Sequence, residues 1–141
     1  MEFTFVQPVP VESENWKNRL ARSRWGQVQL SAYNNNWKEA VRDGINVARH
    51  TGVLPKEELN GLWSVLVTFQ FDKQRKRDPH NYVGTTVKPI IDQMVTMGVF
   101  PDDNANFVNV PQPVLEIVRF TPVQRDQGTD YLMCKIGLVQ L

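Results

Sequence analysis

The chain has 141 residues, and its 22% charged and 41% hydrophobic residues are typical of a globular protein, which excludes an intrinsically disordered chain. Its only cysteine, Cys134, excludes an intramolecular disulfide and a cysteine-based zinc or iron–sulfur centre, and it fits a reducing cytosol. No stretch approaches the roughly 18 apolar residues of a membrane span, and MEFTFVQPVP at the start lacks the pattern of a signal peptide. We therefore expect one cytoplasmic domain over residues 1–141.

The first part of the chain predicts one strand and one helix. Residues 3–6 fit a short strand, which the prolines at positions 8 and 10 end. Residues 12–30 show weak periodicity, and we expect a long, partly ordered loop there. Apolar side chains at three- and four-residue spacing then predict a helix over about 36–50, with asparagines as its N-cap and Gly52 after its end.

The middle of the chain predicts a buried strand followed by a second helix. The run LWSVLVTFQF at 62–71 is β-branched and aromatic, as in a strand inside a core. The second helix is capped by Thr85 or Thr86, tolerates Pro89 in its first turn and ends at Gly98. We expect Trp37 and Trp63 to be core residues, and Cys134 to be a buried small hydrophobe.

The last part of the chain completes the expected fold. Residues 114–121 and 131–141 alternate as two strands, and the loop at 122–130 predicts a hairpin between them. The order strand, helix, strand, helix, strand, strand predicts an α+β fold. In it, two helices pack on a mixed sheet of about four strands.

Two clusters of cations predict binding to a polyanion. One is WKNRLARSRW at 16–25, and the other is KQRKR at 73–77. Trp16 and Trp25 flank the first cluster and are suited either to stacking on exposed bases or to packing in a core or dimer interface. Charge runs are also common on solvated surfaces. The candidate DNA-binding residues are Lys73, Arg75, Lys76 and Arg77, with Arg19, Arg22 and Arg24 as a second set.

Four aspartates follow the second cluster and predict a metal site. They are Asp78, Asp92, Asp102 and Asp103. A strand end, a helix and the turn after it can converge when the helix packs back on the strand. Carboxylates brought together repel unless a cation neutralises them, and Mg²⁺ prefers such oxygen ligands. The alternative is that Asp78-Pro79 and Asp102-Asp103-Asn104 are ordinary turns, which aspartate and asparagine favour.

Two further residues could assist such a site. His80 lies two residues after Asp78 and could be a ligand or a proton carrier, although a single histidine near a turn is more often neither. Lys88 could hold the scissile phosphate or stabilise developing charge. Its alternative role is an exposed ion pair with Asp92, four residues further along the same helix face.

The segments RDPHN at 77–81, VKPIID at 87–92 and GVFPDD at 98–103 together resemble the RusA family of Holliday junction resolvases. The order of the three segments, the lysine-to-aspartate spacing of four and the double aspartate after an aromatic residue all match that family. Two departures are present. His80 stands where the family has a second acid, and the segment between Asn81 and Lys88 is four residues longer than in the shortest family pattern.

The resemblance implies a small homodimeric endonuclease, dependent on Mg²⁺ or Mn²⁺, that resolves four-way DNA junctions by paired nicks and is common in phages. It implies that Asp78, Lys88 and Asp103 are catalytic. The residues implied to hold metal are Asp78, Asp92, Asp102 and Asp103, with His80 in place of an acid. Histidine suits Mn²⁺ better than Mg²⁺.

We therefore expect a metal-dependent endonuclease for Holliday junctions or other branched DNA, active in recombination or repair. Three alternatives remain open. The chain could be a junction-binding protein with weak or no nuclease activity, a phosphodiesterase for another branched or single-stranded nucleic acid, or a structural DNA-binding module. A nuclease needs the carboxylates and the metal, whereas a binding protein needs only the cations and aromatic residues.

Overall fold

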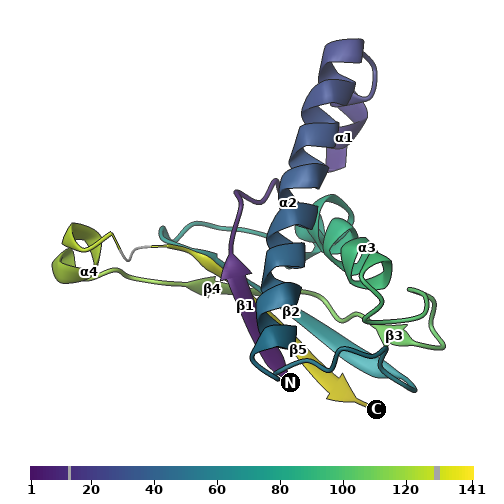
Figure 1. Ribbon diagram of the computed structural model, residues 1–141. Coiled ribbons are helices and arrows are strands. Elements are labelled where there is room, and N and C mark those ends of the chain that lie inside the picture. Colours follow the sequence, from purple (N-terminus) through teal and green to yellow (C-terminus); the bar gives the residue numbers. More distant parts are fainter. Residues whose placement is uncertain (13, 129–130) are drawn as a thin grey trace.

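The computed structural model describes residues 1–12, 14–128 and 131–141, and it confirms the expected α+β class (Figure 1). The described part of the chain forms a five-stranded mixed sheet. The strands are β1 (Glu2–Val6), β2 (Trp63–Phe71), β3 (Val108–Asn109), β4 (Val114–Ile117) and β5 (Met133–Gln140). The helices are α1 (Glu14–Leu20), α2 (Arg24–His50), α3 (Lys88–Thr96) and α4 (Pro122–Asp126), with a 3₁₀ turn at Pro79–Tyr82 and a π turn at Val83–Val87 before α3. None of the helices in these ranges is long and apolar enough to cross a membrane.

Strand β2 is the centre of the sheet. On one side it pairs with β5, which runs antiparallel to it and also pairs with β1. On the other side it pairs in parallel with β3 near its start, Trp63 opposite Val108, and with β4 near its end, Phe71 opposite Ile117. The predicted hairpin between the last two strands is therefore wrong, because β2 lies between β4 and β5. The short helix α4 occupies part of the connection, and Thr129 and Asp130 lie outside the described residues.

The core lies between one face of the sheet and the helices α2 and α3. The alternate residues of β2 are buried on this face, and Trp37 of α2 is fully buried against them. The ring of Trp37 meets the rings of Phe5 and Phe69 edge-on, at centroid distances of 6.2 and 5.7 Å. Gly44 allows α2 to approach β1 closely, because a Cβ there would lie 3.0 Å from the Cβ of Phe5. The predictions for Trp37, Trp63 and Cys134 are confirmed, and burial raises the pKa of the Cys134 thiol.

The loop predicted for residues 12–30 is wrong, since α1 and the first turns of α2 occupy most of that segment; Ser13 lies outside the described residues. Helix α2 begins at Arg24 rather than near Asn36. Ser23 caps it, with its Oγ accepting a hydrogen bond from the Gly26 N–H at 3.0 Å. Gly26 is buried where α1 and α2 meet. A side chain does not fit there, because a Cβ would lie 2.0 Å from the Leu20 carbonyl oxygen. Figure 1 shows this helical hairpin projecting beyond the sheet.

Helix α3 starts at Lys88, so neither Thr85 nor Thr86 is its N-cap. Both threonines are instead fully buried in the π turn, where the Thr85 hydroxyl donates to the Val11 carbonyl at 2.6 Å. The residues that lengthen this segment are thus folded into helical turns that continue into α3. The predicted positions of Pro89 in the first turn and Gly98 after the end are confirmed, and Gly98 has a φ of +71°.

Candidate functional site

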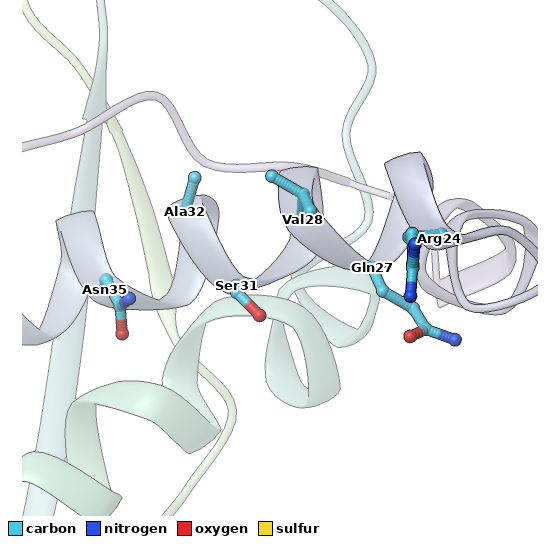
Figure 2. A pocket seen from close by; sticks show the side chains of 6 residues that line it. All are labelled: Arg24, Gln27, Val28, Ser31, Ala32 and Asn35. Atoms are coloured by element: carbon cyan, nitrogen blue, oxygen red, sulfur yellow. The ribbon is translucent and has the colours of Figure 1, made fainter.

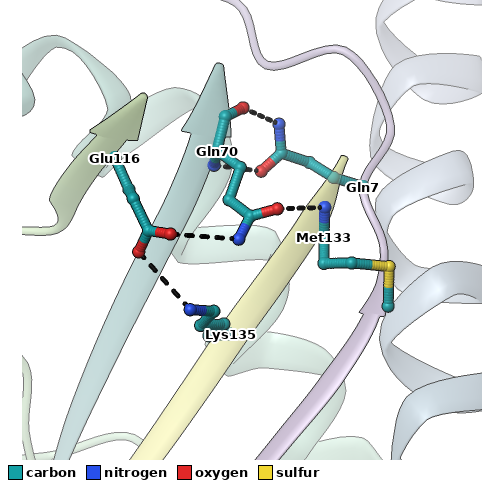
Figure 3. Close-up of polar contacts among 5 residues, drawn as sticks. All are labelled: Gln7, Gln70, Glu116, Met133 and Lys135. Carbon is teal, nitrogen blue, oxygen red and sulfur yellow. Dashed lines mark hydrogen bonds and ion pairs between the residues drawn. The ribbon is translucent and has the colours of Figure 1, made fainter. Parts of the chain in front are cut away.

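The end of β2 leads into the basic run, and a side-chain network fixes its direction (Figure 3). The Gln7 amide mimics a strand neighbour, donating to the Gln70 carbonyl at 2.8 Å and accepting from the Gln70 N–H at 2.9 Å. The Gln70 side chain in turn accepts from the Met133 N–H at 2.9 Å and donates to Glu116 at 3.3 Å. Lys135 bonds the other Glu116 oxygen at 3.4 Å. Four segments are thereby joined where the chain leaves the sheet.

A groove of about 460 Å³ lies just beyond this network, and Asp78 contributes to its wall. Its lining residues are Glu12, Lys76, Arg77, Asp78 and Pro79. The Asp78 carboxylate caps the 3₁₀ turn by accepting a hydrogen bond from the His80 N–H at 3.0 Å. Two carboxylates and two cations therefore share one concave surface.

Glu12 is the residue of this groove that the sequence pattern missed. Its Oε2 accepts a hydrogen bond from Arg75 at 2.9 Å, across 63 positions of the chain. Only the path of the chain after β1 brings it to Asp78. No spacing rule could have identified it, because the two segments belong to different parts of the sequence.

The four cations of the basic run are not equivalent. Arg77 lies with its guanidinium carbon 3.9 Å from the centre of the Phe71 ring and donates to the Lys73 carbonyl at 2.8 Å. Arg75 is paired with Glu12 but its side chain is still 58% exposed, and Lys73 and Lys76 are exposed as well. Arg77 is thus ordered by the chain itself, whereas Lys73, Arg75 and Lys76 present charge to solvent.

Tyr82 anchors the 3₁₀ turn to the end of β2. Its buried ring lies 5.7 Å from that of Phe69 and 5.8 Å from that of Phe71, measured between centroids. Burial raises the pKa of its hydroxyl, and the nearby Glu12 carboxylate raises it further. Asp78, which immediately precedes this turn, is thereby held at the carboxyl end of β2.

Lys88 and Asp92 lie further along the same helical run. They form the exposed ion pair expected from their spacing, with Nζ 3.6 Å from Oδ1. A 3₁₀ turn and a π turn, nine residues in all, separate Lys88 from Asp78 along the chain. Lys88, Pro89 and Asp92 also line a second, smaller cavity together with residues of α1 and α2.

Asp102 and Asp103 lie in an exposed turn beyond α3 that has its own hydrogen bonds. One Asp102 oxygen accepts from the Asp103 N–H at 2.7 Å, and the other accepts from the Asn104 side chain at 3.0 Å. These bonds, the first above all, hold the pKa of Asp102 below its usual value. The Asn104 carbonyl then accepts from the Val108 N–H at 3.1 Å, where β3 joins the sheet.

The four aspartates do not converge within one chain. Helix α3 packs on α2, and the turn after it leads into β3, which pairs with Trp63 at the start of β2. The Asp102 turn therefore lies near that start, while Asp78 follows the end of β2. Nine residues of strand separate these ends by about 26 Å. Consistently, no group of three or more histidine, cysteine or acidic side chains suited to a metal occurs in the ranges that the structure describes.

The basic cluster at residues 16–25 lies on the projecting helical hairpin of α1 and α2. Arg19, Arg22 and Arg24 are exposed there, and Trp25 is 70% exposed. Trp16 packs edge-on against Tyr33 at 5.1 Å, which supports the packing role for Trp16. Figure 2 shows a shallow depression along this part of α2, lined by Arg24, Gln27, Val28, Ser31, Ala32 and Asn35. The hairpin thus presents cations and one aromatic ring well away from the sheet.

Searches of the sequence against protein-family models and against curated proteins found no match. The function is therefore argued from the residues themselves and from their arrangement.

Proposed function

We propose that this protein is a divalent-metal-dependent DNA endonuclease that cuts Holliday junctions or other branched DNA as a homodimer, in the cytoplasm of a bacterial or phage-infected cell. The observation that carries the proposal is the groove in which Asp78 and Glu12 lie beside Lys76 and Arg77. A surface of this kind attracts a DNA phosphate and offers oxygen ligands to a cation at the same place.

The donor set of the groove fits Mg²⁺ or Mn²⁺. Protein sites for Mg²⁺ at phosphate groups often use one or two carboxylates, with water and substrate oxygens as the remaining ligands. Asp78 and Glu12 supply two such carboxylates, and His80 follows Asp78 closely in the chain. A bound ion would polarise the scissile phosphate and favour attack by water.

The chain's own residues would position the substrate. Lys73 and Lys76 are exposed and reach phosphates without losing an internal partner. Arg77 is already ordered by Phe71, so it loses little freedom when it contacts DNA. The exposed hairpin, with Arg19, Arg22 and Arg24, extends this surface and suits the arms of a branched substrate.

The homodimer gives the remaining motif residues a role. Asp103 lies at the opposite end of β2 from Asp78 in the same chain, so the two can act on one phosphate only if they come from different protomers. A two-fold dimer contains two such pairs, which match the two strands that junction resolution must cut. Lys88 and Asp92 lie between these ends on α3.

A second function is favoured by a specific observation. The described residues gather no group of three metal-binding side chains, and His80 replaces an acid of the resembling family. A protein that binds branched DNA without cutting it needs only the cations and the exposed aromatic ring.

One experiment separates the two functions. The purified chain is incubated with four-way junction, flap and linear duplex DNA, with Mg²⁺, with Mn²⁺ and with EDTA. The nuclease predicts paired nicks in the junction that require metal. Tight junction binding with no cleavage under any of these conditions would contradict the nuclease and support the binding protein. Light scattering should report about twice the chain mass of 16.3 kDa.

A further inference from the structure

A second basic cavity lies where α1, α2 and α3 meet, away from the groove at Asp78. It has a volume of about 150 Å³. Its lining residues are Lys17 from α1, Asn34 and Lys38 from α2, and Lys88, Pro89 and Asp92 from α3. Lys38 is not part of either basic cluster of the sequence.

The side chains of this cavity carry a net positive charge. Three lysines and one aspartate line it, and the Asp92 carboxylate is paired with Lys88 at 3.6 Å. Lys38 forms no ion pair with any residue that the structure describes. An anion bound in the cavity would offset the positive charges of Lys38 and Lys88.

The cavity is also held in shape by the fold. Lys17 donates to the Gly84 carbonyl at 2.7 Å and so connects α1 to the π turn before α3. Asn34 and Lys38 are four residues apart on α2 and share a face, as do Lys88 and Asp92 on α3. Each wall is thus provided by a helix, so the backbone positions of the lysines are set before any ligand arrives.

One polar group in the wall lacks a protein partner. The Asn34 Oδ1 atom is buried and has no hydrogen-bond partner among the described residues. A buried acceptor of this kind commonly binds an ordered water molecule.

The positive potential comes from side chains rather than from the start of a helix. The π turn continues directly into α3, and the Lys88 N–H already donates to the Val83 carbonyl. The first amide of α3 is therefore occupied. Lysine ammonium groups act on phosphate as point charges, without the planar fork of arginine, and so suit one compact anion.

We propose that this cavity binds a single phosphate of the DNA backbone, as a contact separate from the groove at Asp78. The choice of DNA as the source of the phosphate rests on the proposed function. The volume is below the roughly 300 Å³ at which ordinary small-molecule pockets begin, so a phosphate group fits while a nucleotide does not. Lys88 and Asp92, which both line the cavity, belong to the VKPIID segment at 87–92.

The test uses Lys38→Gln, with Lys56→Gln in an exposed loop as the matched control. Inorganic phosphate is titrated into the ¹⁵N-labelled protein at constant ionic strength, with chloride as the reference anion. We expect saturable amide shifts at Asn34 and Lys88 that disappear in Lys38→Gln and persist in Lys56→Gln. Lys38→Arg keeps the charge and should restore them.

Junction binding is then measured as a function of salt. Loss of one phosphate contact should reduce the slope of log K against log salt by roughly 0.9 in Lys38→Gln and leave it unchanged in Lys56→Gln. An unchanged slope in Lys38→Gln overturns the proposal, even if inorganic phosphate binds, because the anion site would then not serve DNA. A reduced slope in a protein that never cuts DNA supports this proposal and contradicts only the nuclease.

Discussion

The two ends of β2 both carry aspartates, yet they place them in opposite surroundings. At the carboxyl end, Asp78 lies in a groove with Glu12, Lys76 and Arg77. At the amino end, both carboxylate oxygens of Asp102 accept hydrogen bonds from within their own turn. The comparison teaches that a carboxylate in a sequence motif becomes a candidate for metal and phosphate chemistry through its neighbours. At the carboxyl end of β2, Lys76 and Arg77 can bind a phosphate next to Asp78. At the amino end, the hydrogen bonds of Asp102 stabilise its own turn.

The largest effect is expected at Asp78. Asp78→Asn keeps the volume of the side chain and its ability to accept the His80 N–H, but it removes the charge that holds a cation. Junction cleavage should fall by at least about 100-fold. Substitution of a residue that only hydrogen-bonds to a metal ligand already lowers activity or metal affinity by 10- to 100-fold. Junction binding should stay equal or become tighter. Asp72→Asn, an exposed aspartate six residues earlier, is the control and should cut normally.

Glu12 should have the next largest effect. Glu12→Gln still accepts the hydrogen bond from Arg75, so the groove keeps its shape while losing one negative charge. The Mg²⁺ concentration needed for half-maximal cleavage should rise by about 10-fold. The control is Glu57→Gln, in an exposed loop. A metal requirement that is the same in Glu12→Gln and in the unmodified protein would remove Glu12 from the site.

The exposed and the ordered cations of the basic run should respond differently. Lys76→Gln should lower the salt slope of junction binding by roughly 0.9 and leave the free energy of unfolding unchanged. Arg77→Gln should lower the slope similarly and also cost about 1 kcal/mol of stability, because its guanidinium packs on Phe71. Equal stability of the two variants would show that Arg77 is not ordered by that ring.

The smallest effect is expected at Asp102, and it concerns stability rather than cleavage. Hydrogen bonds to the ionised carboxylate lower its pKa in the folded chain. Its contribution to stability is therefore present above the unfolded pKa of about 3.9 and is lost as the pH falls through the lower folded value. Asp102→Asn should flatten this part of the acid unfolding curve, and an unchanged curve would contradict the role of the turn.

The sequence predicted those elements whose burial has a regular period. The strand at 62–71 and the helix stripe after Pro89 were identified because one side of each faces the core. The start of α2 was missed because residues 24–35 are mostly exposed, so no apolar stripe marks the helix. The predicted β-hairpin between the last two strands was wrong, because β2 lies between β4 and β5 although these are adjacent in sequence.

The candidate site was predictable only in part. The motif identified Asp78 and the Lys88–Asp92 pair, since each depends on local spacing. It could not show that the turn containing Asp103 leads into β3, which pairs with the start of β2. Glu12, Asn34 and Lys38 were missed for the same reason, because their partners in the two cavities are distant in sequence and are set by tertiary packing.

The central claim is that the two ends of β2 cooperate only between protomers, and mixed dimers test it most directly. Asp78→Asn and Asp103→Asn, each inactive as a homodimer, are co-expressed with different tags, and the mixed dimer is isolated. If the site is shared, one of its two sites has both substitutions and the other has neither. The account predicts that this dimer regains metal-dependent cleavage and nicks one strand of a junction. A mixed dimer that binds the junction but cuts neither strand would contradict it, because both carboxylates would then act within one chain.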